Sequence, residues 1–218
     1  MEVFNFRRFK INPVIRAFII ADLALLSGWG LVDPIFAVFV KDRIEGATVV
    51  TIGIAAAIYW IVKSLLQIPV ATMLDRIRGE RDDYMILILG LALSGVSGFG
   101  FVLVDQIWQL YLVRVIQALA FALYIPAWYS IFSRHLDKDH RSFEFSLDST
   151  VTGLMAGMAG LLSGFLVQWF GFVIVFILAA IASLASAGII LMVPEIIYPH
   201  HRRADHVVGD HTPKGINK

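Results

Sequence analysis

The sequence contains no cysteine among its 218 residues. A disulfide scaffold, a thiolate metal site and a cysteine nucleophile are therefore excluded. Charge is also scarce, because charged residues make up 16% of the chain while hydrophobic residues make up 58%. An ordinary soluble domain is about a quarter charged and about half apolar. This imbalance excludes disordered, collagen-like, coiled-coil and small secreted proteins, and it leaves more apolar surface than a soluble fold of this length can bury.

Long apolar runs, separated by short charged breaks, fill most of the chain. They cover residues 14–40, 49–74, 84–104, 107–133, 145–168 and 172–193. Each is long enough for a helix to cross ~30 Å of hydrocarbon, and the run from Tyr84 lacks the alternation of a membrane barrel strand. The first run contains Asp22 and Asp33 and has no small-x-small cleavage site, so we interpret it as a span rather than a signal peptide. We predict an all-α membrane protein with six transmembrane helices.

Basic residues in the short loops predict the orientation, because Lys and Arg concentrate on the cytoplasmic side. Fourteen of them lie on one side of the predicted spans, and only Lys41 and Arg43 lie on the other. We therefore place both termini in the cytoplasm and the protein in the plasma (inner) membrane. The predicted division is a cytoplasmic N-terminal segment (1–13), a six-helix bundle (14–193) and a polar cytoplasmic tail (194–218).

The tail carries His200, His201, His206 and His211. A soft metal-binding tail is conceivable from this composition. Because the histidines lack helical spacing and no Cys accompanies them, we interpret the segment as a solvated tail. No metal and no cofactor are predicted.

Four charged residues lie deep inside the predicted spans, about seven or more residues from the nearer end: Asp22, Asp33, Lys63 and Arg114. Such residues are costly in a bilayer and normally face a cavity or a partner. The helical rise of 1.5 Å per residue puts Asp22 and Lys63 at matched depths, and likewise Asp33 and Arg114, so two acid–base pairs are possible. Two interpretations stay open: a water-lined cavity with a protonatable carboxylate, or two structural ion pairs that hold helices together.

Other polar residues extend this pattern. Tyr59 and Gln67 lie one turn on either side of Lys63, which makes a polar stripe on the second span. Asp148 lies only about one turn from the cytoplasmic edge of the fifth predicted span, where we expect interfacial solvation.

Small residues recur every four positions in two spans. The fifth span has Gly153-x3-Gly157 and Gly160-x3-Gly164, and the third has Gly90-x3-Ser94-x3-Gly98. This spacing lets helix backbones approach closely in lipid. A sliding surface is one interpretation, and static helix packing is the one that we favour.

Two prolines inside spans hint at an internal repeat. Pro34 and Pro126 each follow a leucine by three residues and lie 92 positions apart, and each is expected to kink its helix. Residues 14–104 and 107–193 then form two three-helix units. Because each unit has an odd number of helices, the second runs inverted in the membrane, as in many transporters.

Several motifs together resemble those of the major facilitator superfamily. The loop after the second span reads Asp75-Arg76-Ile-Arg-Gly79-Glu-Arg81, similar to the family's cytoplasmic signature with one extra residue before the glycine. Arg114-x-x-Gln117-Ala118 in the fourth span is similar to the family's Arg-x-x-Gln-Gly. Gly171 and Phe176 at the start of the sixth span, and Pro194-Glu195 after it, also fit. The resemblance covers residues 14–195.

This resemblance implies a fold and a function. The fold is the amino-terminal six-helix half of the family's architecture, made of two inverted three-helix repeats. The function is secondary active transport of a small solute, not enzymatic catalysis. Alone, the bundle leaves its cavity-facing helices uncovered, so a second bundle is expected, most simply from a homodimer. A separate partner half or a truncated gene product are the other options, and no nucleic acid is expected as a partner.

The resemblance also assigns roles to residues. For coupling to substrate or protons it implies Arg114 with Gln117, and Asp22 or Asp33 as the titrating carboxylate. Lys63 and Gln67, on the polar stripe of the second span, complete the candidate set. For a cytoplasmic latch that controls opening it implies Asp75, Arg76, Gly79 and Arg81. The aromatic residues Trp29, Tyr59 and Tyr124 would suit the cavity wall.

Two other functions are open to a membrane protein with six spans: intramembrane proteolysis and scaffolding. An intramembrane serine protease needs a Gly-x-Ser-Gly motif and a histidine in the membrane, and all six histidines lie outside the predicted spans. A non-transporting membrane scaffold or regulatory half-module survives as the alternative, and it requires the polar stripes to be merely structural.

Overall fold

The computed structural model describes residues 12–76, 81–136 and 140–193, and within these ranges the chain is helical and has no strand. The elements are α1 (Pro13–Val32), η2 (Asp33–Ile35), α2 (Phe36–Arg43), α3 (Val49–Arg76), α4 (Arg81–Val102), α5 (Ile107–His135), α6 (Arg141–Phe170) and α7 (Phe172–Leu191). The described part contains six helical segments that are long and apolar enough to cross a membrane, the first being Pro13–Arg43. The six predicted spans are confirmed, with ends displaced by a few residues.

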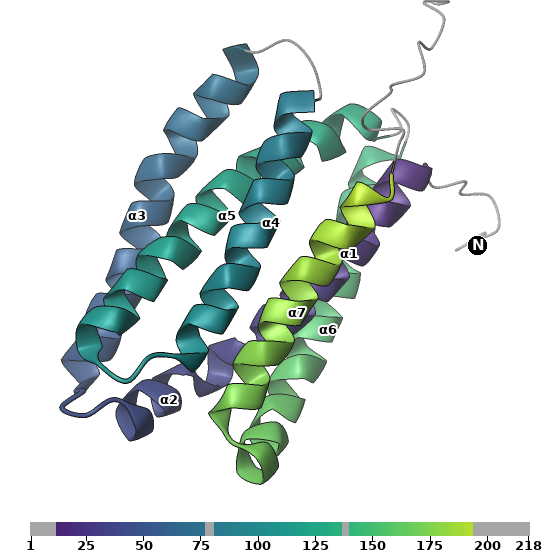
Figure 1. The fold of residues 1–218 in the computed structure, drawn as a ribbon. Helices are drawn as coiled ribbons and strands as arrows, with labels where there is room; N and C mark the ends of the chain where they lie inside the picture. The colour runs from purple at the N-terminus through teal and green to yellow at the C-terminus, as the bar shows by residue number, and fades with distance from the viewer. Residues whose placement is uncertain (1–11, 77–80, 137–139, 194–218) are drawn as a thin grey trace, which may run out of the picture.

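The helices run side by side and alternate in direction, so the bundle has two ends (Figure 1). At the upper end in Figure 1 the helices α1, α4 and α6 begin, and α3, α5 and α7 end. At the lower end lie α2 and the short connections into α3, α5 and α7. The terms upper end and lower end are used below in this sense. The helix ends that flank the predicted cytoplasmic segments in the described part of the chain lie at the upper end.

The interruption expected at Pro34 is present. Pro34 has no backbone N–H to donate along a helix, and a 3₁₀ turn over Asp33–Ile35 separates α1 from α2. Pro126, in contrast, lies inside α5, which continues to His135. Only the first of the two prolines therefore divides its helix.

The helix neighbours confirm the inverted repeat. The helix α1 packs against α6 and α7, α5 packs against α3 and α4, and α4 packs against α7. Exchanging the unit α1–α3–α4 with the unit α5–α6–α7 interchanges the first four of these neighbour pairs and leaves the pair α4–α7 unchanged. Such a pattern is what two inverted repeats related by an axis in the membrane plane produce.

The glycines of α4 serve static packing, as expected. A Cβ atom on Gly90 would stand 2.8 Å from the backbone nitrogen of Tyr124, and one on Gly98 would stand 2.9 Å from that of Ala180. Between these glycines, Ser94 accepts a 2.8 Å hydrogen bond from the Trp29 indole and lies 3.1 Å from the Ser183 hydroxyl. This contact ties α1, α4 and α7 together, and so joins the two repeats.

The glycines of α6 behave differently. Among the described residues no atom lies within 4 Å of a Cβ placed on Gly153, Gly157 or Gly164, and Gly160 makes only ordinary contacts near Gly30 and Pro34. Static packing against another helix of this chain is thus wrong for these three glycines. The stripe is left uncovered.

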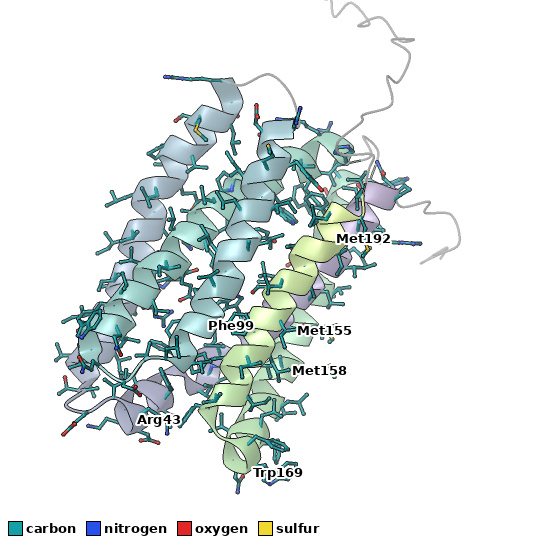
Figure 2. The ribbon with its side chains drawn as sticks, viewed as in Figure 1. Arg43, Phe99, Met155, Met158, Trp169 and Met192 are labelled. Atoms are coloured by element: carbon teal, nitrogen blue, oxygen red, sulfur yellow. The ribbon has the colours of Figure 1, made fainter. Side chains whose placement is uncertain are left out.

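The outward side chains suit a bilayer. Met158 lies along the side of the bundle, whereas Trp169 and Arg43 lie at the lower end (Figure 2). Trp108 and Trp169 are both exposed near the lower end, where amphipathic aromatic rings mark a membrane–water interface.

Candidate functional site

Asp22 is buried inside the bundle. It lies on α1 nine residues after Pro13, roughly 14 Å from the upper end by helical rise, and is only 6% exposed. Its Oδ1 accepts a hydrogen bond from the Tyr124 hydroxyl on α5. Two predicted site residues are therefore brought together, one as a carboxylate and the other as its donor.

Lys63 does not pair with Asp22. Both residues are described, and no ion pair of 4.0 Å or shorter joins them. Instead the Lys63 ammonium lies 3.7 Å from the centre of the Trp60 ring and 5.3 Å from that of Tyr59. The expected pairing is wrong, and the lysine is held by cation–π contacts.

Arg114 lies at the centre of a second cluster. Its Nη1 donates a 2.7 Å hydrogen bond to Gln117 Oε1. Its Cζ stands 3.6 Å from the centre of the Phe36 ring and 5.7 Å from that of Tyr59. Arg114 Nε is buried without a hydrogen-bond partner. We call Arg114, Gln117, Phe36 and Tyr59 the Arg114 cluster.

Asp33 lies near this cluster but does not form a direct ion pair with it. Its carboxylate and Arg114 interact electrostatically, yet no contact of 4.0 Å or shorter links the two described side chains. Asp33 is also exposed at the surface of the bundle. The residue can therefore act on Arg114 through space while it stays accessible from outside the chain.

The three aromatic residues predicted for a cavity wall have different environments. Trp29 is part of the core, where its ring packs edge-to-face on Phe101 and Phe121. Tyr124 is buried against Asp22. Tyr59 is partly buried between Arg114 and Lys63. Trp29 is thus a core residue.

A groove of about 730 Å³ opens between α3 and α5 in the upper half of the bundle. Gln67 and Asp75, both predicted site residues, line it from α3. Tyr129, Ser130 and Arg134 line it from α5. The groove thus brings predicted residues of α3 next to polar residues of α5.

The remaining residues of the predicted latch are less well defined. Arg76 ends α3 and Arg81 begins α4, and both are exposed. Gly79 lies outside the described residues. The structure therefore places three of the four residues at the upper end of the bundle, and of these Asp75 lines the groove.

The comparisons with known proteins agree with this architecture. The sequence profile described as "Major Facilitator Superfamily" matches residues 11–214. The chain belongs to the major facilitator superfamily. No curated protein matches it. Members of the major facilitator superfamily are transporters, and six apolar helices make this member an integral membrane protein.

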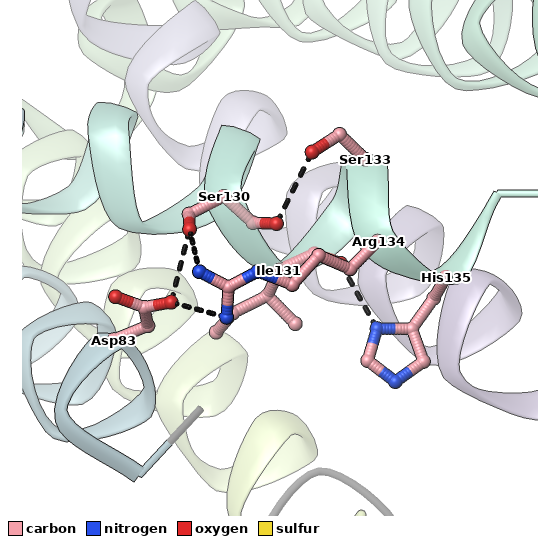
Figure 3. A network of polar contacts seen from close by, with 6 residues as sticks. All are labelled: Asp83, Ser130, Ile131, Ser133, Arg134 and His135. Carbon is pink, nitrogen blue, oxygen red and sulfur yellow. Dashed lines mark hydrogen bonds and ion pairs between the residues drawn. The ribbon is translucent and has the colours of Figure 1, made fainter. Parts of the chain in front are cut away.

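One polar network of this major facilitator superfamily member was not predicted. Arg134 Nη1 forms a 2.7 Å ion pair with Asp83 Oδ2, and Ser130 donates to the same oxygen at 2.9 Å (Figure 3). Asp83 is only 1% exposed, whereas Arg134 is 38% exposed. The sequence signal for this network is an acidic residue in the first turn of α4 and an arginine in the last turn of α5.

Asp148 also differs from expectation. Interfacial solvation was predicted, but the side chain is only 8% exposed and its Oδ1 is buried without a hydrogen-bond partner. The reason is the start of the helix, because α6 begins at Arg141 rather than at residue 145. Asp148 therefore lies about two turns inside the helix.

A Gly-x-Ser-Gly sequence, Gly95-Val-Ser97-Gly98, occurs in α4. Ser97 is fully buried and donates a 2.7 Å hydrogen bond to the Ser94 carbonyl. The flanking glycines pack against Ala180 and Leu184 of α7. In this helix the motif serves packing, and a protease interpretation gains no support from it.

Proposed function

We propose that this member of the major facilitator superfamily is a proton-coupled secondary transporter of a small solute. It works by alternating access between two six-helix bundles, the second of which comes from another copy of the chain. Both termini face the cytoplasm, and the membrane is the plasma (inner) membrane. Asp22, Asp33 and Arg114 are proposed to act in coupling, with Lys63, Gln67 and Gln117 around them, while Asp75, Arg76, Gly79 and Arg81 control opening at the cytoplasmic side.

The buried Asp22 is the observation that carries this proposal. An ionised carboxylate away from water is costly unless a cation or several donors accompany it. Asp22 accepts one hydrogen bond from Tyr124, and no ion pair joins it to any described cation. A residue in this position is suited to taking up and releasing a proton.

The Arg114 cluster supports a role in solute binding. Arg114 is held by Gln117 on one side and by the Phe36 ring on the other. Its Nε has no partner in the described chain, so a donor remains for an acceptor group on a solute. The exposed Asp33 carboxylate nearby can compete for the same guanidinium.

The uncovered faces of α3 and α6 support a second bundle. Within each of these two helices 17% of the apolar stretch is buried inside the chain, compared with 44–50% in the other four spans. The glycine stripe on α6 has the spacing of helix-contact surfaces in membranes, and nothing in the described chain covers it. Because closed twofold pairs dominate oligomers, a second copy is the proposed partner.

Proton-driven uptake tests the proposal. The full chain is reconstituted in lipid vesicles under an imposed pH gradient, and uptake is measured for representative labelled amino acids, sugars, nucleosides and organic cations. We expect gradient-dependent uptake of one class, and we expect Asp22→Asn and Asp33→Asn to abolish it. Asp105→Asn, which changes an exposed carboxylate at the lower end, is the matched control and should transport normally.

Absence of flux with every class would favour a non-transporting scaffold or regulatory module. One observation fits that second candidate, because the Trp29–Ser94–Ser183 contact joins the two repeats internally without any ligand. Under that function, Asp22→Asn would change stability and leave no transport phenotype to measure.

A further inference from the structure

Asp22 has a second carboxylate in its surroundings. Asp148 lies seven residues after the start of α6, and Asp22 lies nine residues after the start of α1. Both helices begin at the upper end and pack against one another, so the two residues share a depth of roughly 10–14 Å. Asp148 interacts electrostatically with both Asp22 and Tyr124. The four residues Asp22, Tyr124, Trp128 and Asp148 are called the carboxylate cluster below.

The carboxylate cluster contains two buried polar atoms without a hydrogen-bond partner. These are Asp148 Oδ1 and Trp128 Nε1, on side chains that are 8% and 7% exposed. Trp128 lies one turn after Tyr124 on α5, and its ring packs 6.4 Å from that of Phe18, one turn before Asp22 on α1, so the indole belongs to the cluster. Buried polar atoms rarely lack partners, and an acceptor and a donor left open in one cluster indicate a missing ligand.

The donors present favour a proton over a metal ion. The Tyr124 hydroxyl donates to Asp22, and an indole N–H can only donate. Metal cations such as Na⁺ or Ca²⁺ require oxygen atoms that accept, and N–H and O–H groups directed at the site oppose them. Two donors instead suit one remaining negative charge, which is the state of two carboxylates that share a single proton.

The charged groups around the cluster can be named helix by helix. From α5 the titratable side chain that faces Asp22 is Tyr124, and from α6 it is Asp148. The adjacent α7 carries no titratable residue. On α6 itself Glu144 is buried one turn before Asp148, and on α1 Arg16 is exposed toward the upper end. No cation among the described residues forms an ion pair with either aspartate.

Aromatic rings lie between the carboxylate cluster and the upper end. Phe18 packs on Trp128 and Phe132, and Phe145 packs on the same two rings. Phe132 is stacked on Trp128 with ring centres 4.3 Å apart. This layer comes from α1, α5 and α6, the same helices that supply the cluster, and it separates the two carboxyl groups from the upper end.

We propose that the Asp22 and Asp148 carboxyl groups hold one proton between them, so that Asp148 is the second member of the coupling site. The proton resides on either carboxyl group and leaves the other ionised, with Tyr124 and Trp128 as donors to the remaining charge. This inference rests on the proposed proton coupling. It adds a residue from α6 to coupling residues that otherwise come from α1, η2, α3 and α5.

Infrared titration tests the pairing with the proton itself as the probe. The full chain is reconstituted in lipid vesicles, and difference spectra record the carbonyl stretch of protonated carboxyl groups as the pH is varied. Two coupled groups titrate in two separated steps that belong to the pair. We expect two such steps in the wild type, a single step displaced by at least about one pH unit in Asp22→Asn and in Asp148→Asn, and neither step in the double variant.

Two controls keep this test decisive. Asp105→Asn should leave both steps unchanged, and Asp148→Glu, which keeps a carboxyl group, should restore two steps. If Asp148→Asn does not fold, Tyr124→Phe, which removes a donor, is expected to move both steps together. A wild-type titration equal to the sum of the two single-variant titrations would overturn the pairing.

The pairing and the transport proposal fail in different ways. Additive titrations together with uptake that is lost in Asp22→Asn would overturn the pair and leave proton-coupled transport standing. Coupled steps without any gradient-driven uptake would leave the pair standing and overturn transport.

Discussion

The two cations inside the bundle are stabilised by contacts with neutral neighbours rather than by the ion pairs expected from their depth in the membrane. Arg114 depends on Gln117 and on the face of Phe36, and Lys63 depends on Trp60 and Tyr59. A guanidinium that stacks on an aromatic ring keeps its N–H donors free for hydrogen bonds, because these donors lie in the plane of the guanidinium itself. Replacing a neutral neighbour should therefore destabilise each of these cations.

Replacing Gln117 tests this dependence. Gln117→Leu removes the acceptor of the 2.7 Å bond from Arg114 and should lower the free energy of unfolding by about 2 kcal/mol, as expected for a lost hydrogen bond to a charged group. The measurement is thermal unfolding in detergent. Gln67→Leu is the matched control, since no hydrogen bond of Gln67 is found among the described residues, and an equal loss in both variants would contradict the argument.

The Asp83–Arg134 pair predicts an asymmetry between its partners. Arg134→Gln leaves the fully buried Asp83 with Ser130 as its donor, and breaking such a pair costs about 3 kcal/mol. Asp83→Asn should cost less, about 1 kcal/mol, because the half-exposed Arg134 can bind water. A double-mutant cycle by thermal unfolding measures the coupling, and equal costs for the two single variants would contradict the prediction.

Depth along a helix could be predicted from the sequence, but the direction of a side chain around the helix could not. Asp22 and Lys63 were placed at the same depth, yet α1 packs against α6 and α7 while α3 packs against α5. Their helices are not close neighbours, so the residues have different partners. Asp148 was misjudged for another reason, because the polar first turn of α6 hid the true start of the helix.

At the scale of elements, the two small-residue stripes have opposite environments. The stripe on α4 is filled by α5 and α7, whereas the stripe on α6 meets nothing in the described chain. The sequence spacing is the same in both. Spacing therefore predicts a surface for close approach, and only the arrangement of helices decides which neighbour uses it.

Alanine substitutions separate these two stripes. Gly98→Ala puts a Cβ 2.9 Å from Ala180 and should destabilise the chain by about 1–3 kcal/mol through overpacking, more than alanine gains in helix propensity. Gly157→Ala meets no atom within 4 Å and should leave the unfolding temperature unchanged or slightly raised. Similar losses in both variants would show that the α6 stripe is packed within the chain.

At the scale of the whole molecule, the fold could be predicted from the six apolar runs and from the odd number of runs in each repeat. The sequence predicted that the two repeats are related by symmetry, but it did not predict which helices pack against one another. Many different arrangements can be built from the same six spans. The surfaces of α3 and α6 are what the single chain leaves open. They belong to equivalent positions in the two repeats, which is the expected geometry for one flat face of a two-bundle assembly.

Cysteine crosslinking tests whether a second copy covers this face. Because the chain has no cysteine, single substitutions report directly. Leu65→Cys on α3 and Leu161→Cys on α6, at side chains 69% and 71% exposed, should crosslink two copies in membranes. Val96→Cys on the outer side of α4 should not, and crosslinking at Val96 alone, or a strict monomer, would contradict the proposed homodimer.

The inverted repeat also has an electrical consequence. The offset of 92 residues that relates Pro34 to Pro126 relates Asp22 to Arg114 as well, so the acidic and the basic residue occupy corresponding places at opposite depths. A charge within the bilayer gains or loses about 2.3 kcal/mol per 100 mV of membrane potential when it crosses the whole field. Neutralising Asp22 while Arg114 stays charged would change the charge inside that field. Proton uptake at this bundle would therefore respond to voltage as well as to pH.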